Sequence, residues 1–250
     1  KSIKKIYSLK GRPKFNPLII HYHNIAETEN DVEINDMFKK LYKKFCPGPI
    51  TFILKRKINS KIQPIACANL KTVAIRFPKH KIIRTLLKNI SYPLAMPSAN
   101  KSNNVSPVSA IDVYEEFKKK LNIILDGGVS KIGIESTVID LSSDLKILRP
   151  GIINKNIIEK TLKKKIKDNT KRKKILSPGM IKKHYSPGIP VKINQTKHDG
   201  KSAFIYFGNQ YKKREKFFYL SKKSNLNEAA SNLYKILRKI KKMGYKKIQI

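Results

Sequence analysis

The amino-acid sequence predicts two successive α/β domains. In residues 1–153 short apolar runs alternate with helical patterns, and after a stretch rich in Pro and Gly a further strand, helix and strand follow in that order. The strand–helix–strand order favours parallel pairing, because a helix commonly carries the chain between parallel strands. We therefore expect a first domain at 1–153, a helix and interdomain linker at 154–190, and a small α/β domain at 191–250.

Five short apolar runs of the first domain are predicted strands. Each is bounded by Pro, Gly or polar residues, as strands commonly are. The runs are NPLIIHY (16–22), PITFIL (49–54), TVAIRF (72–77), NIILDGG (122–128) and STVIDL (136–141).

Three segments between and after these strands are predicted helices. Residues 31–45 have apolar residues at helical spacing and end before a CPGP sequence. In the segment 106–121, Ser106 is the expected N-cap and Pro107 the first helical residue. The third segment, 154–166, places four apolar residues on one face, namely Ile157, Ile158, Leu162 and Ile166.

The second block follows two irregular stretches. Residues 167–174 are polar and charged, and SPGMIKKHYSPGIP (177–190) is too rich in Pro and Gly for a helix or a strand. Beyond them SAFIYF (202–207) and YKKIQI (245–250) are predicted strands. The helix between them ends at Gly244 and has an apolar stripe formed by Leu226, Ala229, Ala230, Leu233, Leu237 and Ile240.

The formal net charge of +38 has two interpretations. Clustered Lys and Arg bind nucleic-acid phosphates, so the charge could serve an RNA or DNA surface. The excess is mostly Lys and is spread along the whole chain, which favours coding bias in an AT-rich genome. Either way, a charge of this size attracts polyanions without sequence preference.

The cysteines and the hydropathy of the sequence indicate the cellular compartment. Cys46 and Cys67 form neither a disulfide framework nor a zinc-like spacing with the histidines, and no apolar run approaches the roughly 20 residues of a membrane span. We therefore expect a cytoplasmic protein. The chain opens without Met and closes on a strand that has only just begun, so we also expect it to be a fragment of a longer protein.

Four stretches carry the candidate chemistry. Lys10 and Arg12 lie two residues apart, so in an extended chain both side chains would face one anion, although a solvated pair is the usual state of such residues in a Lys-rich chain. The loop PLAMPSANKSNNVSP (93–107) is rich in hydroxyl and amide groups that could hold a phosphate, or it could be an ordinary turn. GIESTVID (133–140) and ILRPG (147–151) add polar residues beside apolar strands.

Taken together and in order, these stretches resemble threonylcarbamoyl-AMP synthase. The series KGRPKFNPLIIH, CPGPITFIL, TVAIRFP, PLAMPSANKSNNVSP, LDGGVSKIGIESTVIDL, LRPG and SPGMIKKHYSPGIPV is similar to that of the long form. The resemblance runs from about residue 10 to residue 190. It implies a YrdC-like domain with a twisted mixed sheet, a linker, and a small Rossmann-like α/β domain.

The resemblance also implies an activity. Enzymes of this family combine L-threonine, bicarbonate and ATP, with Mg²⁺, into threonylcarbamoyl-adenylate and pyrophosphate. A separate transferase complex then modifies adenosine 37 of tRNA. The implied partners are therefore ATP, L-threonine, bicarbonate and Mg²⁺, with a tRNA or double-stranded RNA contact and the downstream complex.

The resemblance assigns roles residue by residue. A catalytic tetrad around the phosphates and carbamate is implied at Lys10, Arg12, Ser98 and Asn100. ATP contacts are implied at Arg12, Asn16, Thr72, Ser98, Ser106, Arg149, His184 and Tyr185. Threonine contacts are implied at His21, Arg76, Met96 (through its backbone) and Ser136. Two expectations follow: the tetrad surrounds one pocket, and residues 177–190 cross its mouth with Tyr185 as the chief contact.

Three departures and two alternatives accompany the resemblance. The family has a Thr-Tyr-Gly-Leu-type segment before the lysine motif that this sequence lacks, and Met96 and Ser186 stand where smaller residues are usual. A non-catalytic double-stranded RNA or tRNA-binding module of the same fold is the main alternative. A hydrogenase-maturation carbamoyltransferase is disfavoured because the sequence has no Cys-x-x-Cys pairs.

Overall fold

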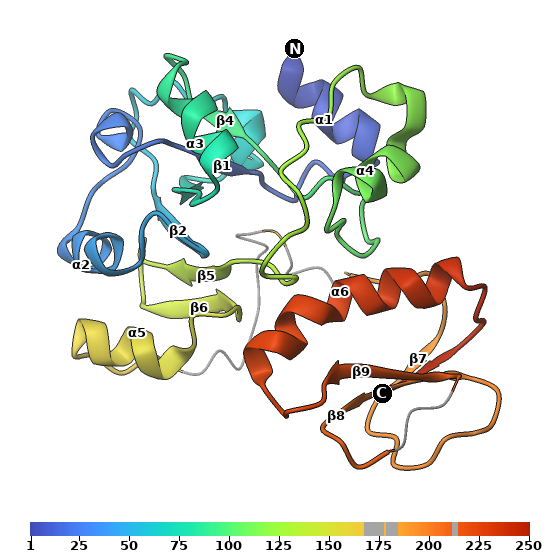
Figure 1. Cartoon of the computed structure of the whole chain (residues 1–250). Helices are drawn as coiled ribbons and strands as arrows, with labels where there is room; N and C mark the ends of the chain where they lie inside the picture. Colours follow the sequence, from blue (N-terminus) through green and yellow to red (C-terminus); the bar gives the residue numbers. More distant parts are fainter. Residues whose placement is uncertain (168–177, 179–184, 212–214) are drawn as a thin grey trace. The chain divides into compact units, whose positions relative to one another are not determined.

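A six-stranded mixed sheet organises the first of two units in the computed structural model, which describes residues 1–167, 178, 185–211 and 215–250 (Figure 1). This unit comprises residues 1–97 and 135–182. Its strand order is β4-β1-β3-β2-β5-β6. The strands are β1 (Ile19–His21), β2 (Ile50–Lys55), β3 (Thr72–Arg76), β4 (Leu94–Ala95), β5 (Thr137–Asp140) and β6 (Lys146–Arg149).

The helices of the first unit are short. They are α1 (Ser2–Lys10), η1 (Ala26–Thr28), α2 (Asp36–Phe45), η2 (Pro64–Cys67), α3 (Lys81–Lys88) and α5 (Lys155–Leu162). Phe38 and Leu41 of α2 and Ile158 and Leu162 of α5 join the main core with sheet residues such as Phe52. Burying these side chains supplies most of the driving force that holds the helices on the sheet.

The two faces of this sheet differ in character. Side chains alternate between faces along a strand, so Ile20, Phe52 and Ile75 face the main core. The opposite face carries a small apolar cluster of Ile19, Ile53, Ala74, Val138 and Leu148. By the same alternation, polar residues near the strand ends share this second face, which we call the polar sheet face.

The second unit comprises residues 98–134 and 183–250. Its four-stranded sheet is parallel throughout, in the order β7-β10-β8-β9. The elements are α4 (Ala110–Phe117), η3 (Lys118–Lys120), β7 (Val191–Lys192), β8 (Ala203–Phe207), β9 (Phe217–Ser221), α6 (Leu226–Lys242) and β10 (Ile248–Gln249). The α/β class and the parallel pairing of this region confirm the expectation from sequence.

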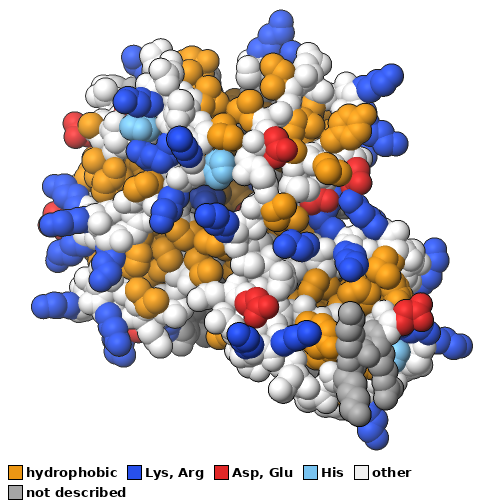
Figure 2. Space-filling model, in the orientation of Figure 1, with side chains coloured by type: hydrophobic (Ala, Val, Ile, Leu, Met, Phe, Trp, Pro, Cys, Tyr) orange, Lys and Arg blue, Asp and Glu red, His pale blue; other side chains and the backbone are white. Residues whose placement is uncertain are grey.

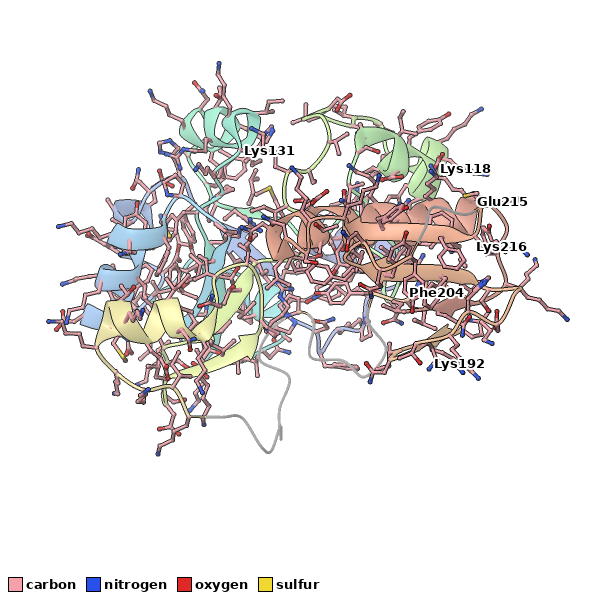
Figure 3. All side chains as sticks on the ribbon, turned by 60° about the horizontal axis from the view of Figure 1, so that its bottom comes forward. Lys118, Lys131, Lys192, Phe204, Glu215 and Lys216 are labelled. Atoms are coloured by element: carbon pink, nitrogen blue, oxygen red, sulfur yellow. The ribbon has the colours of Figure 1, made fainter. Side chains whose placement is uncertain are left out.

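Helix α6 covers one face of the parallel sheet, as Figure 1 shows. Its Tyr234, Leu237 and Ile240 pack with Ala203 and Ile205 of β8. On the other face the Phe204 ring, labelled in Figure 3, contacts the rings of Tyr211 and Phe217 at centroid distances of 5.2 and 5.3 Å. Aromatic side chains therefore pack on the face of β8 that α6 does not cover.

The Lys10–Arg12 stretch is not extended, which corrects one prediction. Lys10 is the last residue of α1, and Gly11 adopts the left-handed conformation, with φ 57° and ψ 38°, that ends many helices. The Gly11 and Arg12 amides then donate to the Ser8 and Tyr7 carbonyls at 3.1 and 2.9 Å. A helix end followed by a sharp turn therefore sets the directions of the two side chains.

The predicted strand at 122–128 is absent. Ile123 and Leu125 are 78% and 60% exposed, and the Gly128 amide donates to the Asp126 carboxylate in a turn. An apolar run alone does not make a strand where no neighbouring strand pairs with it.

Several helix boundaries also differ from prediction. The helix expected from residue 106 begins at Ala110, because Ser109 and not Ser106 caps it through the Asp112 amide. The helix expected over 31–45 begins at Asp36 after the Asn35 cap, and that expected over 154–166 spans Lys155–Leu162. In α6, Ala229, Leu237 and Ile240 are buried as predicted, whereas Leu226 is 76% exposed. Strands β4, β6, β7 and β9 and helices α1 and α3 were not predicted.

Candidate functional site

His21 and Arg76 lie side by side at the ends of two parallel strands. They are register partners in β1 and β3, and Thr51 of β2 is the partner of Arg76 on its other side. All three side chains therefore share the polar sheet face. The predicted threonine residues His21 and Arg76, separated by 55 positions in the sequence, are thus brought together by sheet pairing.

Burial keeps the His21 ring neutral. Desolvation first, and the charge of Arg76 second, lower the pKa of His21 to about 3, although the carbonyls of Ile19 and Leu94 oppose this. The ring lies 3.1 Å through Nδ1 from the Ile19 carbonyl, which can only accept, so Nδ1 carries the proton. Beside a substrate, His21 therefore acts as an oriented, uncharged polar group.

Arg76 is a partly desolvated cation on the same face. Burial lowers the pKa of its guanidinium, Glu135 opposes the shift, and Arg149 adds to it. The pKa falls from a very high starting value, so the group keeps its charge at neutral pH. Its Nε donates to the Gly48 carbonyl at 3.4 Å, which anchors the base of the fork. Such a group suits a carboxylate ligand.

Ser136 joins three strands through hydrogen bonds. Its hydroxyl lies 2.8 Å from that of Thr51, and Arg149 donates to its hydroxyl through Nη2 and to its carbonyl through Nε, both at 3.0 Å. A β-bulge between Val138 and Ile139 shifts the β5–β6 register next to Arg149. Bulges commonly redirect side chains near sites in this way. The predicted residues Ser136 and Arg149 therefore share a hydrogen-bonded group.

Thr51 is the residue of this group that the sequence analysis missed. It is fully buried within the apolar strand β2 and holds the Ser136 hydroxyl. The sequence contained a signal for it, because a Thr within an apolar strand run needs a polar partner when buried.

Arg12 and Asn16 form a second group before β1. Arg12 donates through Nη2 to the Asn16 side-chain oxygen at 2.6 Å and to the Pro17 carbonyl at 2.7 Å, and through Nε to the Asn16 carbonyl at 3.0 Å. Lys10, Arg12 and Asn16 are all buried. Extending the β1–β3 register places Thr72 level with Pro17, and its buried hydroxyl has no hydrogen-bond partner among the described residues. Three residues with implied ATP contacts thus gather at one end of these strands.

The two groups lie at opposite ends of β3. Thr72 and Arg76 are its first and last residues, so at a rise of about 3.3 Å per residue they are roughly 13 Å apart. Met96 is bound beside β1, where its amide donates to the Ile19 carbonyl at 3.1 Å. A backbone contact from Met96 to a ligand would therefore use its carbonyl oxygen.

The remaining predicted residues belong to the second unit or lie outside the described residues. Ser98, Asn100 and Ser106 are in the second unit, where Asn100 and Ser106 are buried. Tyr185 stacks on Tyr234 of α6, with ring centroids 5.5 Å apart. His184 and the rest of 179–184, together with residue 177, fall outside the described residues, so the predicted crossing of the pocket mouth by 177–190 stays a prediction. The gathering of Lys10, Arg12, Ser98 and Asn100 around one pocket stays a prediction.

Neither thiol of the chain is prepared for nucleophilic attack. Burial raises the pKa of Cys46 to about 12 and that of Cys67 to about 11, against the lowering effect of Arg76 and Arg56 respectively. Within the part of the chain that the structure describes, no three His, Cys, Asp or Glu side chains cluster as metal ligands. None of its helices is long and apolar enough to cross a membrane.

Comparison with known proteins gives matches along the whole chain. A family model described as "Telomere recombination", covering Sua5, YciO and YrdC, matches residues 1–151, and one described as "Threonylcarbamoyl-AMP synthase, C-terminal domain" matches 153–250. Threonylcarbamoyl-AMP synthase of Pyrococcus abyssi is 42% identical over 164 residues, which cover 64% of this chain and 47% of that protein. The Bacillus subtilis protein of the same name is 41% identical over 160 residues, covering 63% and 46%.

Solved structures agree with these matches. The crystal structure of P. abyssi Sua5 complexed with L-threonine superposes with a TM-score of 0.88 at 34% identity, covering 99% of this chain and 78% of that one. Escherichia coli YciO, at 20% identity and a TM-score of 0.56, shares the fold over 63% of the chain. The chain spans about half the length of the curated relatives it matches. With its first family model covering residues 1–151 and the second the remainder, the chain belongs to the Sua5–YciO–YrdC family, in the long form that carries a threonylcarbamoyl-AMP synthase C-terminal domain.

Proposed function

We propose that this chain forms the main part of an L-threonylcarbamoyladenylate synthase. The reaction joins L-threonine, bicarbonate and ATP, releases pyrophosphate, and supplies the threonylcarbamoyl group for tRNA position 37. The observation that carries the proposal is the polar sheet face, where Arg76, neutral His21 and Ser136 lie at the strand ends. A relative whose structure is described as complexed with L-threonine supports it.

Arg76 and its neighbours would bind threonine. The guanidinium would pair with the substrate carboxylate, which its planar fork fits. His21 and the Thr51–Ser136 hydroxyl pair would meet the amine and hydroxyl. A pocket that hydrogen-bonds a hydroxyl can reject an isostere lacking it by a factor of about 10⁴ or more.

Arg12, Asn16 and Thr72 would hold ATP from the other end of the strands. The unpartnered buried Thr72 hydroxyl supports this assignment, because buried polar atoms rarely lack a partner. Ser98, Ser106, Arg149, His184 and Tyr185 complete the proposed nucleotide contacts. Lys10 and Asn100 complete the proposed catalytic tetrad with Arg12 and Ser98. Among the described residues no group of carboxylates is arranged to hold a metal ion, and Mg²⁺ would enter as part of the substrate MgATP, held by the phosphates.

The chemistry needs positioning and charge, and no covalent nucleophile. The threonine amine attacks bicarbonate and water leaves, which gives a carbamate. A carbamate oxygen then attacks the α-phosphorus while the bond to the bridging oxygen of the β-phosphate breaks, and pyrophosphate departs. Cationic side chains would stabilise the charge that develops on the oxygens. The raised pKa of Cys46 agrees with a route without a thiolate.

An ATP–pyrophosphate exchange assay on the full-length protein tests the proposal. We expect exchange of labelled pyrophosphate into ATP only when threonine and bicarbonate are both present. Serine and valine in place of threonine serve as controls for the pocket. Exchange without threonine would contradict the assignment of threonine as the substrate. No exchange under any condition, together with threonine-independent RNA binding, would favour the non-catalytic RNA-binding alternative. A cytoplasmic location, with its tRNA and transferase partners, is part of the same proposal.

A further inference from the structure

Residues 98–134 belong to the first family model by sequence but pack with the C-terminal region. Val105 and Val108 are buried in the same core as Ile205, Leu237 and Ile248. The segment carries Ser98 and Ser106, which are assigned above to ATP, and Asn100 of the proposed catalytic tetrad. The C-terminal region therefore contributes to the surroundings of the loop Ser98–Ser106, which we call the nucleotide loop.

Arg238 of α6 is the main polar contact between this helix and the nucleotide loop. It donates through Nη1 to the Val105 carbonyl at 3.0 Å and through Nη2 to the Asp112 carbonyl at 3.1 Å. Its Nε lies 3.1 Å from Asp112 Oδ1, and the side chains of Arg238 and Asp112 are only 13% and 9% exposed. One guanidinium thus ties the end of the loop to the first turn of α4.

Two carboxylates of α4 complete the network. Asp112 accepts from the Val108 amide at 3.0 Å, and although burial tends to raise the pKa of Asp112, this bond and Arg238 hold it below its usual value. Glu116 accepts from the Lys101 amide at 3.0 Å and from the Asn104 side chain at 2.6 Å. Because Asn100 donates to the Asn104 carbonyl at 2.9 Å, the network reaches a predicted catalytic residue.

The start of the C-terminal region is attached to the same loop and the same helix. The Val105 amide donates to the Ser186 carbonyl at 3.2 Å, and the Ser186 amide donates to the Asn103 carbonyl at 2.8 Å. Its neighbour Tyr185, which is also assigned to ATP, stacks on Tyr234 of α6. Helix α6 therefore holds the nucleotide loop through Arg238 and Tyr185 through Tyr234.

We propose that helix α6 of the C-terminal region is a positioning element for ATP, with Arg238 as its key residue. Arg238 acts through the backbone of the nucleotide loop and is assigned no contact with the nucleotide. The inference rests on the proposed function, because it assumes that the loop and Tyr185 meet ATP. It gives the C-terminal region a role in the reaction beyond folding.

Arg238→Ala tests the inference in the full-length protein. Loss of bonds from a charged donor predicts an ATP Kd about tenfold higher, measured by calorimetry, with threonine affinity unchanged. Arg238→Lys keeps the charge but cannot span two carbonyls and a carboxylate, so we expect only partial recovery. Lys235→Ala removes an equal charge from an exposed position of the same helix and should match the wild type.

Hydrogen–deuterium exchange gives a readout that does not depend on activity. The amides of Lys101 and Val105 should exchange faster in Arg238→Ala but not in Lys235→Ala. If Arg238→Ala fails to fold, Glu116→Ala replaces it, with Glu116→Gln as the variant that keeps the acceptor oxygen.

The outcomes separate this inference from the proposed function. The positioning role of α6 would be overturned if Arg238→Ala left hydrogen–deuterium exchange in the nucleotide loop unchanged. It would also be overturned if this exchange became faster while the ATP Kd stayed the same. A wild-type protein that binds ATP but forms no adenylate would contradict the synthase proposal. The change in its ATP Kd on Arg238→Ala would still test the positioning role of α6.

Discussion

Arg76 keeps a cation on the polar sheet face, beside the neutral His21 ring and next to a small apolar cluster. Its neighbours on that face include Ala74 and Ile53, which offer no polar side-chain group. Its Nε donates to the Gly48 carbonyl, and Glu135 supplies a nearby negative charge. A desolvated Arg binds an anion more strongly than an exposed one does, because water screens the pair less. We therefore expect Arg76 to contribute most to binding when the ligand carries a carboxylate.

Arg76→Ala should weaken threonine use far more than ATP binding. The lost charge-assisted contact is worth roughly 1.5–3 kcal/mol, which is about a 10- to 150-fold rise in the threonine Kd. Lys40→Ala, which removes an exposed cation of α2 on the opposite side of the sheet, is the matched control and should change neither affinity. Titration calorimetry with each substrate measures both, and equal losses for ATP and threonine would mean that Arg76 is structural.

His21 should make stability depend on pH. Its pKa is about 3 in the folded protein and 6.5 in the unfolded chain, so between these values the unfolded state binds the extra proton. Stability is therefore fully present above pH 6.5 and falls as the pH drops towards 3. From pH 7 to pH 5 we expect a loss of roughly 2 kcal/mol in the free energy of unfolding.

Urea denaturation at pH 7 and pH 5 measures this effect. His21→Gln removes the titrating group, so the difference between the two pH values should shrink by that amount whatever the absolute stability of the variant. An equal pH dependence in both proteins would show that the His21 ring is not held neutral.

At the scale of elements, the sequence predicted what periodicity and turn residues encode. The strands over NPLIIHY, PITFIL, TVAIRF and STVIDL all form, because each apolar run finds a partner on at least one side. The run at 122–128 looked the same in sequence but has no partner strand, and pairing is a property of the fold. Ser106 was the predicted cap of the following helix, but it is buried and Ser109 caps that helix instead.

Residue identities in the site were predictable from resemblance, but their connections were not. The alternation of β3 places Thr72 and Arg76 on one face, which a sequence can show. The hydroxyl pair of Thr51 and Ser136 depends on register between strands 85 residues apart. No local pattern encodes that register.

Gly151 should be needed for the turn that follows β6. A Cβ at this position would lie 2.4 Å from the Thr137 amide nitrogen and 2.8 Å from the Glu135 carbonyl, so Gly151→Ala forces backbone to move beside Ser136. We expect a loss of about 1–3 kcal/mol in stability and weaker threonine binding.

Gly11→Ala is the matched control for this prediction. A Cβ at Gly11 meets nothing within 4 Å, and the only cost is its left-handed conformation, about 1–2 kcal/mol. Thermal denaturation and threonine titration compare the two variants. We expect Gly11→Ala to leave threonine affinity unchanged. Equal threonine affinities for Gly11→Ala and Gly151→Ala would show that β6 can shift without disturbing Ser136.

At the scale of the whole molecule, the positive side chains are dispersed rather than clustered. Figure 2 shows Lys and Arg side chains spread over much of the visible face, among apolar and neutral groups. In Figure 3, Lys118, Lys131 and Lys192 come from three separate segments, and all three are exposed. A surface built to read one nucleic acid would instead gather its cations, commonly with stacking aromatics.

A dispersed charge of +38 should bind polyanions without regard to their structure. We expect the protein to bind tRNA, double-stranded RNA and heparin with similar affinity at low salt, because each offers closely spaced negative charges. If about six to ten phosphates are contacted, affinity for RNA should fall roughly 10³-fold or more between 50 and 200 mM salt. Filter binding across a salt series, with heparin as competitor, measures both quantities. A tRNA preference over heparin that persists at 200 mM salt would contradict this interpretation and identify the charge as a recognition surface.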